Sequence, residues 1–316
     1  MLPKAAWESE QEEPRVKQDV QERIRYLKKE RNALILAHNY QVDEVQDSAD
    51  FVGDSFGLSR QAAAADKDVI VFCGVNFMAE TAAILAPEKT VLLPEIMAGC
   101  PLADMITAED LREAKIQYPE AAVVCYVNST AEVKAESDIC CTSSNAVKVV
   151  NSLPQEEVLF VPDGNLAHWV SLNSRKKIIP WKGFCPTHHK ITLDDIDRVR
   201  EARPGAPVAV HPECHPDLVA KADFVGSTGA ILDYARKSAA PEMIIGTEMG
   251  ILHRLELDNP GKKFYLLSSR LVCPNMKYTT LEKVLNSLEK METVIRVPEE
   301  IRNKAKVALE RMLAIG

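Results

Sequence analysis

Long apolar stretches are missing from this 316-residue sequence, because no run approaches the ~18 residues that a membrane-spanning helix needs. Clusters of lysine and arginine are missing as well, and the net charge is −8. A nucleic-acid-binding surface requires clustered cations to meet the phosphates, so this class of function is disfavoured. With 46% hydrophobic and 27% charged residues, the composition is that of an ordinary globular protein. We therefore expect no membrane and no nucleic-acid partner, and any anionic ligand has to be bound locally.

Features of a secretory signal are also missing from the first residues. Residues 1–13 are polar and acidic, with neither a basic start nor an apolar core, and we interpret residues 1–19 as a flexible leader. Eight cysteines in a chain of this length favour a reducing compartment over a disulfide scaffold. We therefore expect a cytoplasmic protein whose thiols are free to bind metal.

Three Cys-Pro pairs recur at a nearly constant interval. Their cysteines, Cys100, Cys185 and Cys273, lie 85 and 88 residues apart. Other positions repeat in step with them: an apolar run ends in a polar marker residue, an aspartate follows twelve residues later, and a hydroxyl residue stands five residues beyond the aspartate. These positions are His38, Asp50 and Ser55, then Tyr126, Asp138 and Ser143, then His211, Asp223 and Thr228. The pattern indicates a unit of roughly 87 residues that is used three times.

Within each unit, short apolar runs alternate with segments of helical spacing. This alternation predicts an α/β fold of three homologous α/β/α units with short parallel sheets. The predicted strands are 33–37, 51–52, 68–73, 90–93, 121–126, 139–140, 158–161, 177–179, 208–210, 224–225, 243–245 and 264–267, and the last predicted helices are 280–291 and 298–313. No linker separates the units, so we expect domains 20–107, 108–191 and 192–316, the last with the C-terminal helices, in pseudo-threefold symmetry around a central active site.

Polar residues follow the predicted strands, and the carboxyl ends of strands face the ligand crevice in open α/β sheets. We therefore expect the following side chains to converge: His38, Tyr40, Tyr126, Asn128, His211 and Glu213. Ser55, Ser143 and Thr228 stand near the start of predicted helices and could be helix caps only. Three helix N-termini at one point would instead hold a small polyanion, each contributing about 0.3–1 kcal/mol when exposed.

The three repeated cysteines suit a soft metal centre. Three thiolates leave one position open, which favours a catalytic centre over a closed structural zinc site. The residues alone also allow a zinc enzyme on the same thiols, or an electron-transfer or iron–sulfur assembly protein. The remaining cysteines fall in or beside predicted strands and are interpreted as small buried hydrophobic residues: Cys73, Cys125, Cys140, Cys141 and Cys214.

These motifs resemble the quinolinate synthase family, over about residues 20 to 312. The resemblance is carried by Ala37-His38-Asn39-Tyr40-Gln41, Gly53-Asp54-Ser55, Gly99-Cys100-Pro101-Leu102-Ala103-Asp104, Tyr126-Val127-Asn128-Ser129, Cys141-Thr142-Ser143-Ser144-Asn145-Ala146, His211-Pro212-Glu213-Cys214, Gly226-Ser227-Thr228-Gly229 and the run from Cys273 to Lys283. So many motifs in this order are highly specific.

The resemblance implies a three-domain protein with a [4Fe-4S] cluster on Cys100, Cys185 and Cys273, whose fourth iron is free to act as a Lewis acid. The implied reaction is a transferase-type condensation of iminoaspartate with dihydroxyacetone phosphate to quinolinate, phosphate and water, on the route to NAD. The L-aspartate oxidase that supplies iminoaspartate is the protein partner that it suggests.

The resemblance also implies which residues act. Substrate contacts would come from His38, Ser55, Tyr126, Val127, Asn128, Ser143, His211, Pro212, Glu213 and Thr228, and the acid/base candidates are Tyr40, Tyr126, His211 and Glu213. Some members of the family carry a redox Cys-x-x-Cys around the last cluster ligand. Here Ser269, Arg270, Asn275 and Met276 lie near Cys273, so we expect no disulfide switch.

Overall fold

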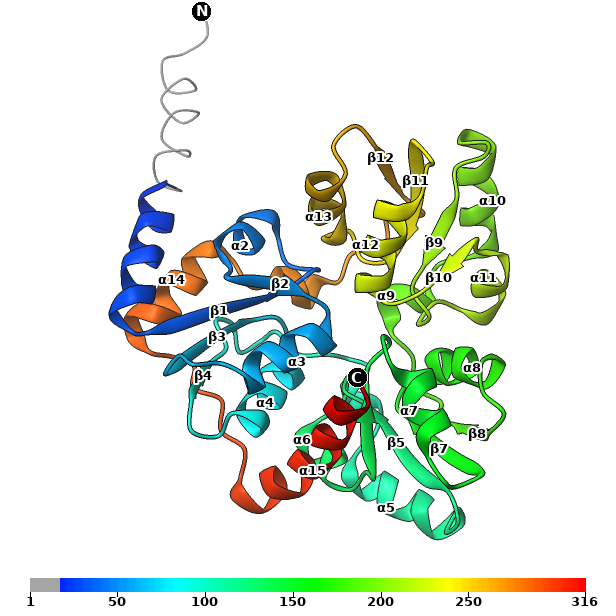
Figure 1. Cartoon of the computed structure of the whole chain (residues 1–316), viewed down its shortest axis with the longest axis horizontal. Coiled ribbons are helices and arrows are strands. Elements are labelled where there is room, and N and C mark those ends of the chain that lie inside the picture. Colours follow the sequence, from blue (N-terminus) through cyan, green and yellow to red (C-terminus); the bar gives the residue numbers. More distant parts are fainter. Residues whose placement is uncertain (1–17) are drawn as a thin grey trace, which may run out of the picture.

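The computed structural model describes residues 18–316 and contains three α/β units around a common centre (Figure 1). Each unit has one four-stranded sheet in which all strand pairs are parallel. The strand orders are β2-β1-β3-β4, β6-β5-β7-β8 and β10-β9-β11-β12, so the same topology occurs three times. The predicted fold of three homologous α/β units is confirmed.

The first unit follows a helix at 18–30. Its elements are β1 (Ala33–His38), α2 (Asp43–Ser48), β2 (Phe51–Gly53), α3 (Ser55–Ala63), β3 (Val69–Cys73), α4 (Asn76–Leu85) and β4 (Thr90–Leu92). A 3₁₀ turn η1 (Ala103–Met105) ends the first unit. The second unit contains α5 (Ala108–Gln117), β5 (Ala122–Tyr126), α6 (Ala131–Ala135), β6 (Ile139–Cys141), α7 (Ala146–Ser152), β7 (Glu157–Val161), α8 (Gly164–Leu172), β8 (Lys177–Pro180) and α9 (Pro186–His189).

The third unit contains α10 (Leu193–Ala202), β9 (Val208–Val210), α11 (Pro216–Lys221), β10 (Phe224–Val225), α12 (Thr228–Lys237), β11 (Glu242–Gly246), α13 (Ile251–Asp258), β12 (Lys263–Leu266) and a 3₁₀ turn η2 (Pro274–Lys277). Two helices complete the chain, α14 (Leu281–Lys290) and α15 (Glu299–Ile315). All twelve predicted strands are present, with ends within one residue of the prediction. The predicted leader lies outside the described residues up to residue 17, and residues 18 and 19 are helical.

The repeated aspartates tie each edge strand to the first strand of its unit. In every unit the carboxylate accepts a hydrogen bond from a backbone N–H fifteen residues earlier in the chain. The bonds are Ile35 N to Asp50 Oδ2 (2.8 Å), Val123 N to Asp138 Oδ2 (2.7 Å) and Val208 N to Asp223 Oδ2 (2.8 Å). This part of the sequence repeat therefore maintains the fold and lies apart from the site.

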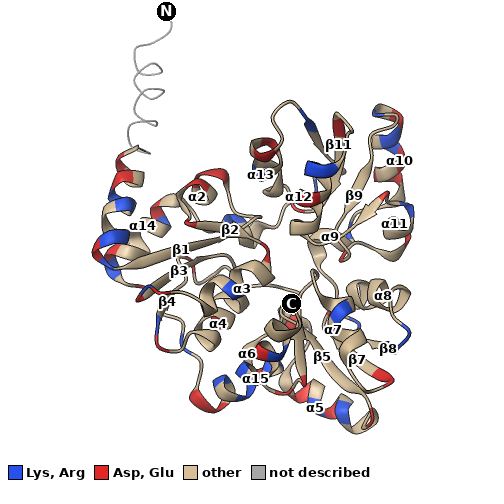
Figure 2. Cartoon of the chain, in the orientation of Figure 1, with Lys and Arg blue, Asp and Glu red and all other residues tan. Residues whose placement is uncertain are grey.

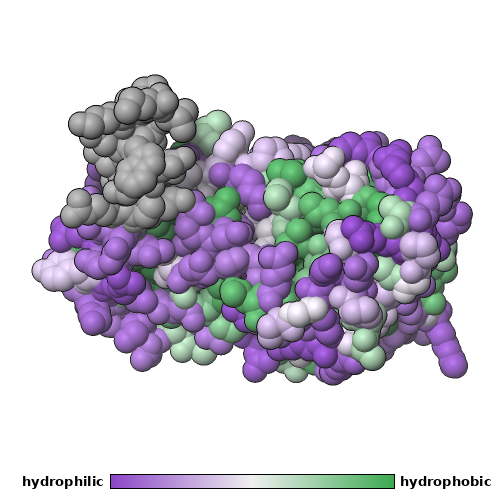
Figure 3. Space-filling model, turned by 90° about the horizontal axis from the view of Figure 1, so that it is seen from above, coloured by the Kyte–Doolittle hydropathy of each residue, from purple (hydrophilic) through white to green (hydrophobic). Residues whose placement is uncertain are grey.

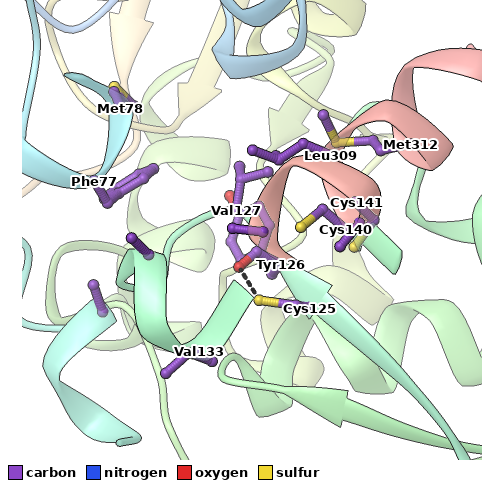
Figure 4. Close-up of a cluster of buried hydrophobic side chains, with 14 of the residues drawn as sticks. Phe77, Met78, Cys125, Tyr126, Val127, Val133, Cys140, Cys141, Leu309 and Met312 are labelled. Atoms are coloured by element: carbon purple, nitrogen blue, oxygen red, sulfur yellow. Dashed lines mark hydrogen bonds between the residues drawn. The ribbon is translucent and has the colours of Figure 1, made fainter. Parts of the chain in front are cut away.

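The C-terminal helices cross back from the third unit to the other two. Leu281, Val284 and Leu288 of α14 pack in one core with strands of the first unit, including Ile35. Helix α15 packs against α6 and β6 of the second unit and α4 of the first. Figure 4 shows its Leu309 and Met312 beside Val127, Cys140 and Cys141. We keep 20–107, 108–191 and 192–316 as the proposed domain division, with α14 and α15 joining the units.

Charged residues of both signs are spread over the outer helices of all three units (Figure 2). In Figure 3 the upper face is largely hydrophilic, with hydrophobic side chains visible between the hydrophilic areas. None of the helices within residues 18–316 is both long enough and apolar enough to cross a membrane.

Candidate active site

A cavity of about 270 Å³ is lined by residues from all three units. Most of the predicted site residues line it: His38, Tyr40, Ser55, Cys100, Tyr126, Asn128, Ser143, Cys185, His211, Glu213, Thr228 and Cys273. Val127 and Pro212 are buried beside the cavity but do not line it. The sheets converge as expected, because these residues follow the carboxyl ends of parallel strands.

Each of the three cysteines precedes a short helical turn, and for Cys185 and Cys273 this turn begins with proline. Cys185 is the N-cap residue of α9, and Cys273 is the N-cap residue of η2. Cys100 stands three residues before η1, and the N–H groups of Ala103 and Leu102 approach its sulfur. Burial nevertheless raises the pKa of all three thiols, that of Cys100 to about 12. A bound cation would lower these pKa values and hold the residues as thiolates.

Two buried carboxyl groups hold the backbone of two of these cysteines. Asp163 Oδ2 accepts a hydrogen bond from Cys185 N (3.2 Å), and Glu248 Oε1 accepts one from Cys273 N (3.1 Å). Lys277 Nζ lies 3.1 Å from the other oxygen of Glu248. Burial raises the pKa of both acids. They fix the two cysteine loops relative to the strands that precede the acids, and sequence reasoning missed them.

Glu213 is the centre of a hydrogen-bonded cluster in the cavity. Its Oε2 lies 2.8 Å from His188 Nδ1 and 3.4 Å from His211 Nδ1, and its Oε1 accepts a hydrogen bond from Asn128 Nδ2 (3.4 Å). His188 also lies 3.2 Å from Cys185 Sγ through the same Nδ1. The carboxylate therefore connects polar side chains of the second and third units to a thiol of the proposed metal centre.

Burial by itself raises the pKa of Glu213, but the charge of His211 and the hydrogen bond from His188 outweigh it and hold the pKa well below its usual range. Burial lowers the pKa of His211. The contacts of Glu213 with His188 and Asn128 do not depend on the charge of His211. Glu213 is therefore a carboxylate at neutral pH.

Burial shifts the pKa values of the two tyrosines and of His38 in opposite directions. Burial raises the pKa of Tyr40 and Tyr126 well above the usual value, and the negative charge of Glu213 adds to this effect. Burial lowers the pKa of His38 to about 3, and His211 shifts it in the same direction. At neutral pH both phenols are protonated and His38 is neutral, so the phenols can donate protons to a bound anion.

The three hydroxyl residues are not the helix caps. Asp54 and Ser227 cap α3 and α12 through their side chains, so Ser55 and Thr228 are the first helical residues. Thr228 Oγ1 accepts a hydrogen bond from Asn39 Nδ2 (3.0 Å), and Ser143 Oγ lies 3.1 Å from His211 Nε2. Because the capping role belongs to neighbouring residues, these hydroxyls remain candidates for ligand binding.

The three units meet at Asp54, which also lines the cavity. Its Oδ2 accepts a hydrogen bond from Ser144 Oγ of the second unit (2.5 Å). The same oxygen would lie only 3.1 Å from a Cβ at Gly229 of the third unit, so glycine permits this approach. Asp54 therefore joins the edges of all three units.

Comparison with known proteins identifies the family of this chain. Residues 22–314 match the family described as "Quinolinate synthetase A protein". The chain belongs to this family. It is 59% identical over 296 residues to the quinolinate synthase of Dehalococcoides mccartyi strain 195, covering 94% of this chain and 98% of the relative. It is 58% identical over 294 residues to that of Methanosarcina barkeri, covering 93% and 97%, and 57% identical over 296 residues to that of Geobacter metallireducens, covering 94% and 97%.

The donor atoms of the site fit an iron–sulfur cluster better than a single ion on the three thiols. Around one zinc ion, bond lengths of about 2.3 Å place thiolate sulfurs roughly 3.8 Å apart. Within residues 18–316, Cys100, Cys185 and Cys273 do not form a group whose ligand atoms all lie within 4.8 Å. A cluster needs the wider spacing, because each thiolate binds a different iron.

The residues that sequence reasoning missed differ in the signal that they offer. His188 follows Cys185 after two residues, a ligand-like spacing that could have been noticed. Asp163 and Glu248 both stand two residues after the third strand of their units. Thr247 and Lys277 carry no such signal, because their contacts with His188 and Glu248 are made across the fold.

Proposed function

We propose that this protein condenses iminoaspartate with dihydroxyacetone phosphate to give quinolinate, phosphate and water, as a transferase-type step of NAD biosynthesis. The observation that carries the proposal is one cavity in which three widely spaced thiols meet three hydroxyls from equivalent positions of the units. The family membership supports the same conclusion. On this proposal the protein acts in the cytoplasm, where an L-aspartate oxidase would supply iminoaspartate.

Cys100, Cys185 and Cys273 would hold a [4Fe-4S] cluster, whose open iron would supply Lewis-acid chemistry toward a carbonyl or hydroxyl oxygen. Asp163 and Glu248 would keep two of the three ligand loops in place through the backbone N–H groups of the cysteines. Hydrogen bonds around a metal site commonly hold the ligands in position in this way.

The anionic substrates would be bound by hydroxyls and helix N-termini. Ser55 and Thr228 open α3 and α12, and Ser143 precedes α7. A helix N-terminus favours an anion, by up to about 2 kcal/mol when partly buried. This allows phosphate and carboxylate groups to bind in a protein of negative net charge.

Proton transfers would be shared between groups of different acidity. The reaction has no net redox change, so each step is a proton transfer, a condensation or an elimination. Tyr40 and Tyr126 are protonated and would donate protons, while the carboxylate of Glu213 would accept them. The contacts with His188 and His211 make Glu213 a weak base, so we expect substrate binding to rearrange these contacts.

Anaerobic protein incubated with iminoaspartate and dihydroxyacetone phosphate should form quinolinate, and it should contain about four irons with a broad visible absorption. Cys273→Ser protein is the matched control and should contain no cluster and form no quinolinate. Protein with a full cluster and both substrates but no product would refute the proposed activity. Protein that holds zinc alone on the three thiols would refute the proposed cofactor.

A further inference from the structure

Three metal-ligating atoms of different residues are already gathered in the cavity. Cys185 Sγ, His188 Nδ1 and Glu213 Oε2 lie within 4.8 Å of one another, and no other such group was found in the described part of the chain. His188 Nδ1 is 3.2 Å from the sulfur and 2.8 Å from the carboxylate oxygen. The side chains of His188 and Glu213 are only 2% and 4% exposed. Of these ligands, only Cys185 belongs to the proposed cluster.

The spacing is close to that of a single tetrahedral zinc ion. Zinc binds sulfur at about 2.3 Å and nitrogen or oxygen at about 2.0–2.2 Å, which separates neighbouring ligand atoms by roughly 3.3–3.6 Å. The distances from His188 Nδ1 are a few tenths of an ångström shorter, so a modest opening of the group would admit an ion. The fourth coordination position would face the cavity, which all three residues line.

The orientation of His188 suits this role. Its other nitrogen, Nε2, lies 2.8 Å from Thr247 Oγ1. A second contact of this kind fixes the ring of a metal-binding histidine and aims the remaining nitrogen at the metal. Nδ1 therefore points at the sulfur and the carboxylate, while Nε2 on the other side of the ring already has Thr247 as its hydrogen-bond partner.

The charges balance as well. One thiolate, one carboxylate and one neutral imidazole carry two negative charges, which neutralise a divalent ion, so no net charge is buried. This mixture of sulfur, nitrogen and oxygen favours zinc over the harder magnesium and calcium ions.

We propose that the cluster-free protein binds one zinc ion through Cys185, His188 and Glu213, and that this ion excludes the cluster because both need Cys185. On binding, the thiol proton of Cys185 leaves to the solvent. The neutral imidazole carries its proton on Nε2 instead of Nδ1, so that Nε2–H donates a hydrogen bond to Thr247 Oγ1, and no electron is transferred. The zinc site itself stands apart from the proposed catalytic activity, whereas the competition rests on the proposed cluster. The zinc-bound form is inactive, because the ion occupies both a cluster ligand and the acid/base carboxylate.

The test uses full-length, cluster-free protein prepared anaerobically with a chelator. Zinc is titrated against a chromophoric competing chelator, and cobalt is used in parallel because its visible absorption reports tetrahedral coordination and thiolate ligation. We expect one zinc per chain. His188→Gln and Glu213→Gln should each weaken zinc binding by at least about 100-fold, since changes to second-shell partners alone cost about 10–100-fold.

Cys273→Ser is the deciding control, because it removes a cluster ligand but leaves the zinc ligands intact. It should prevent cluster reconstitution and keep the wild-type zinc affinity, whereas His188→Gln should still accept the cluster. Cluster reconstitution of wild-type protein should fail when one equivalent of zinc is added first. Wild-type protein that binds no zinc, or a Cys273→Ser protein that loses zinc as fully as His188→Gln, would overturn the proposal. Quinolinate formation by reconstituted wild-type protein tests the catalytic activity separately.

Discussion

Lys134 on α6 has no exposed surface, although it is a charged residue. Its ammonium group donates a hydrogen bond to Ser129 O and lies 5.4 Å from the centre of the Phe77 ring. Ser129 directly follows Asn128, and its hydroxyl donates to Tyr126 O (2.8 Å). Lys134 is therefore a positioning residue for the loop that carries Tyr126 and Asn128 into the cavity, and Lys134→Met tests this role.

The contacts set the size of the effect. A hydrogen bond from a charged group contributes about 1.5–3 kcal/mol, and an ammonium over an aromatic ring about 0.5–2 kcal/mol. Methionine fills the space of the lysine stem and avoids the cost of burying a charge, which offsets part of the loss. We expect the free energy of unfolding to fall by about 2 kcal/mol. A displacement of about 1 Å in a substrate-positioning loop costs about 10²-fold in rate, so kcat/KM should fall by about that factor.

The assay combines denaturant unfolding, iron content and quinolinate formation. Lys134→Met should keep its irons, because the three cysteine loops are untouched, and lose activity. Lys148→Met is the matched control, because the ammonium group of Lys148 makes an exposed hydrogen bond to Gly316 O (3.2 Å). This substitution should change neither the free energy of unfolding nor kcat/KM. A Lys134→Met protein with wild-type kcat/KM and with its stability reduced by less than about 0.5 kcal/mol would refute the reasoning.

Four further predictions concern the site. Substitution of serine for Cys273, or for either other proposed cluster cysteine, should abolish iron binding. Cys141→Ala should retain about four irons, because the thiol of Cys141 is buried in the core. Iron analysis distinguishes these two outcomes. Thr228→Val should weaken substrate binding by about 1–3 kcal/mol without loss of stability, and an unchanged KM with lower stability would show a structural role only. Glu213→Gln should lower kcat by about 10² or more with an intact cluster spectrum, and near-normal turnover would move the base to another residue. Burial lowers the pKa of His38 from 6.5 to about 3. The contribution of neutral His38 to the free energy of unfolding is therefore full above pH 6.5 and is lost as the pH falls toward 3. NMR shifts of the His38 ring that titrate near 6.5 would contradict this.

The strands and the cavity residues could be predicted from the sequence because their signals are local. A buried parallel strand is a short apolar run, and the run that ends at His38 stops where the chain reaches the cavity. The threefold recurrence then placed Cys100, Cys185 and Cys273 at equivalent points, although they are far apart in the chain. Repetition supplied the long-range information that a single sequence normally lacks.

The buried charges could not be predicted, because their burial depends on distant segments. Lys134 lies in Ala131-Glu132-Val133-Lys134-Ala135, which reads as a surface helix. It is covered because α15 and α4 pack against α6. The same limit applies to α14 and α15: their apolar spacing predicts helices, but nothing local indicates that they pack on the first and second units. Glu248 likewise becomes part of the site only through its contacts with Cys273 and Lys277.

Symmetry and its loss have different functions in this fold. The thiols stand at equivalent positions in all three units, and Cys100, Cys185 and Cys273 would hold the proposed cluster as a set of three like ligands. The residues two positions after the markers His38, Tyr126 and His211 are instead different, being Tyr40, Asn128 and Glu213. The two unlike substrates of the proposed reaction would need donors and acceptors of different acidity around one centre. We infer that the repeated thiols would serve the proposed metal centre, while divergence at Tyr40, Asn128 and Glu213 would supply the proton-transfer chemistry of the proposed reaction.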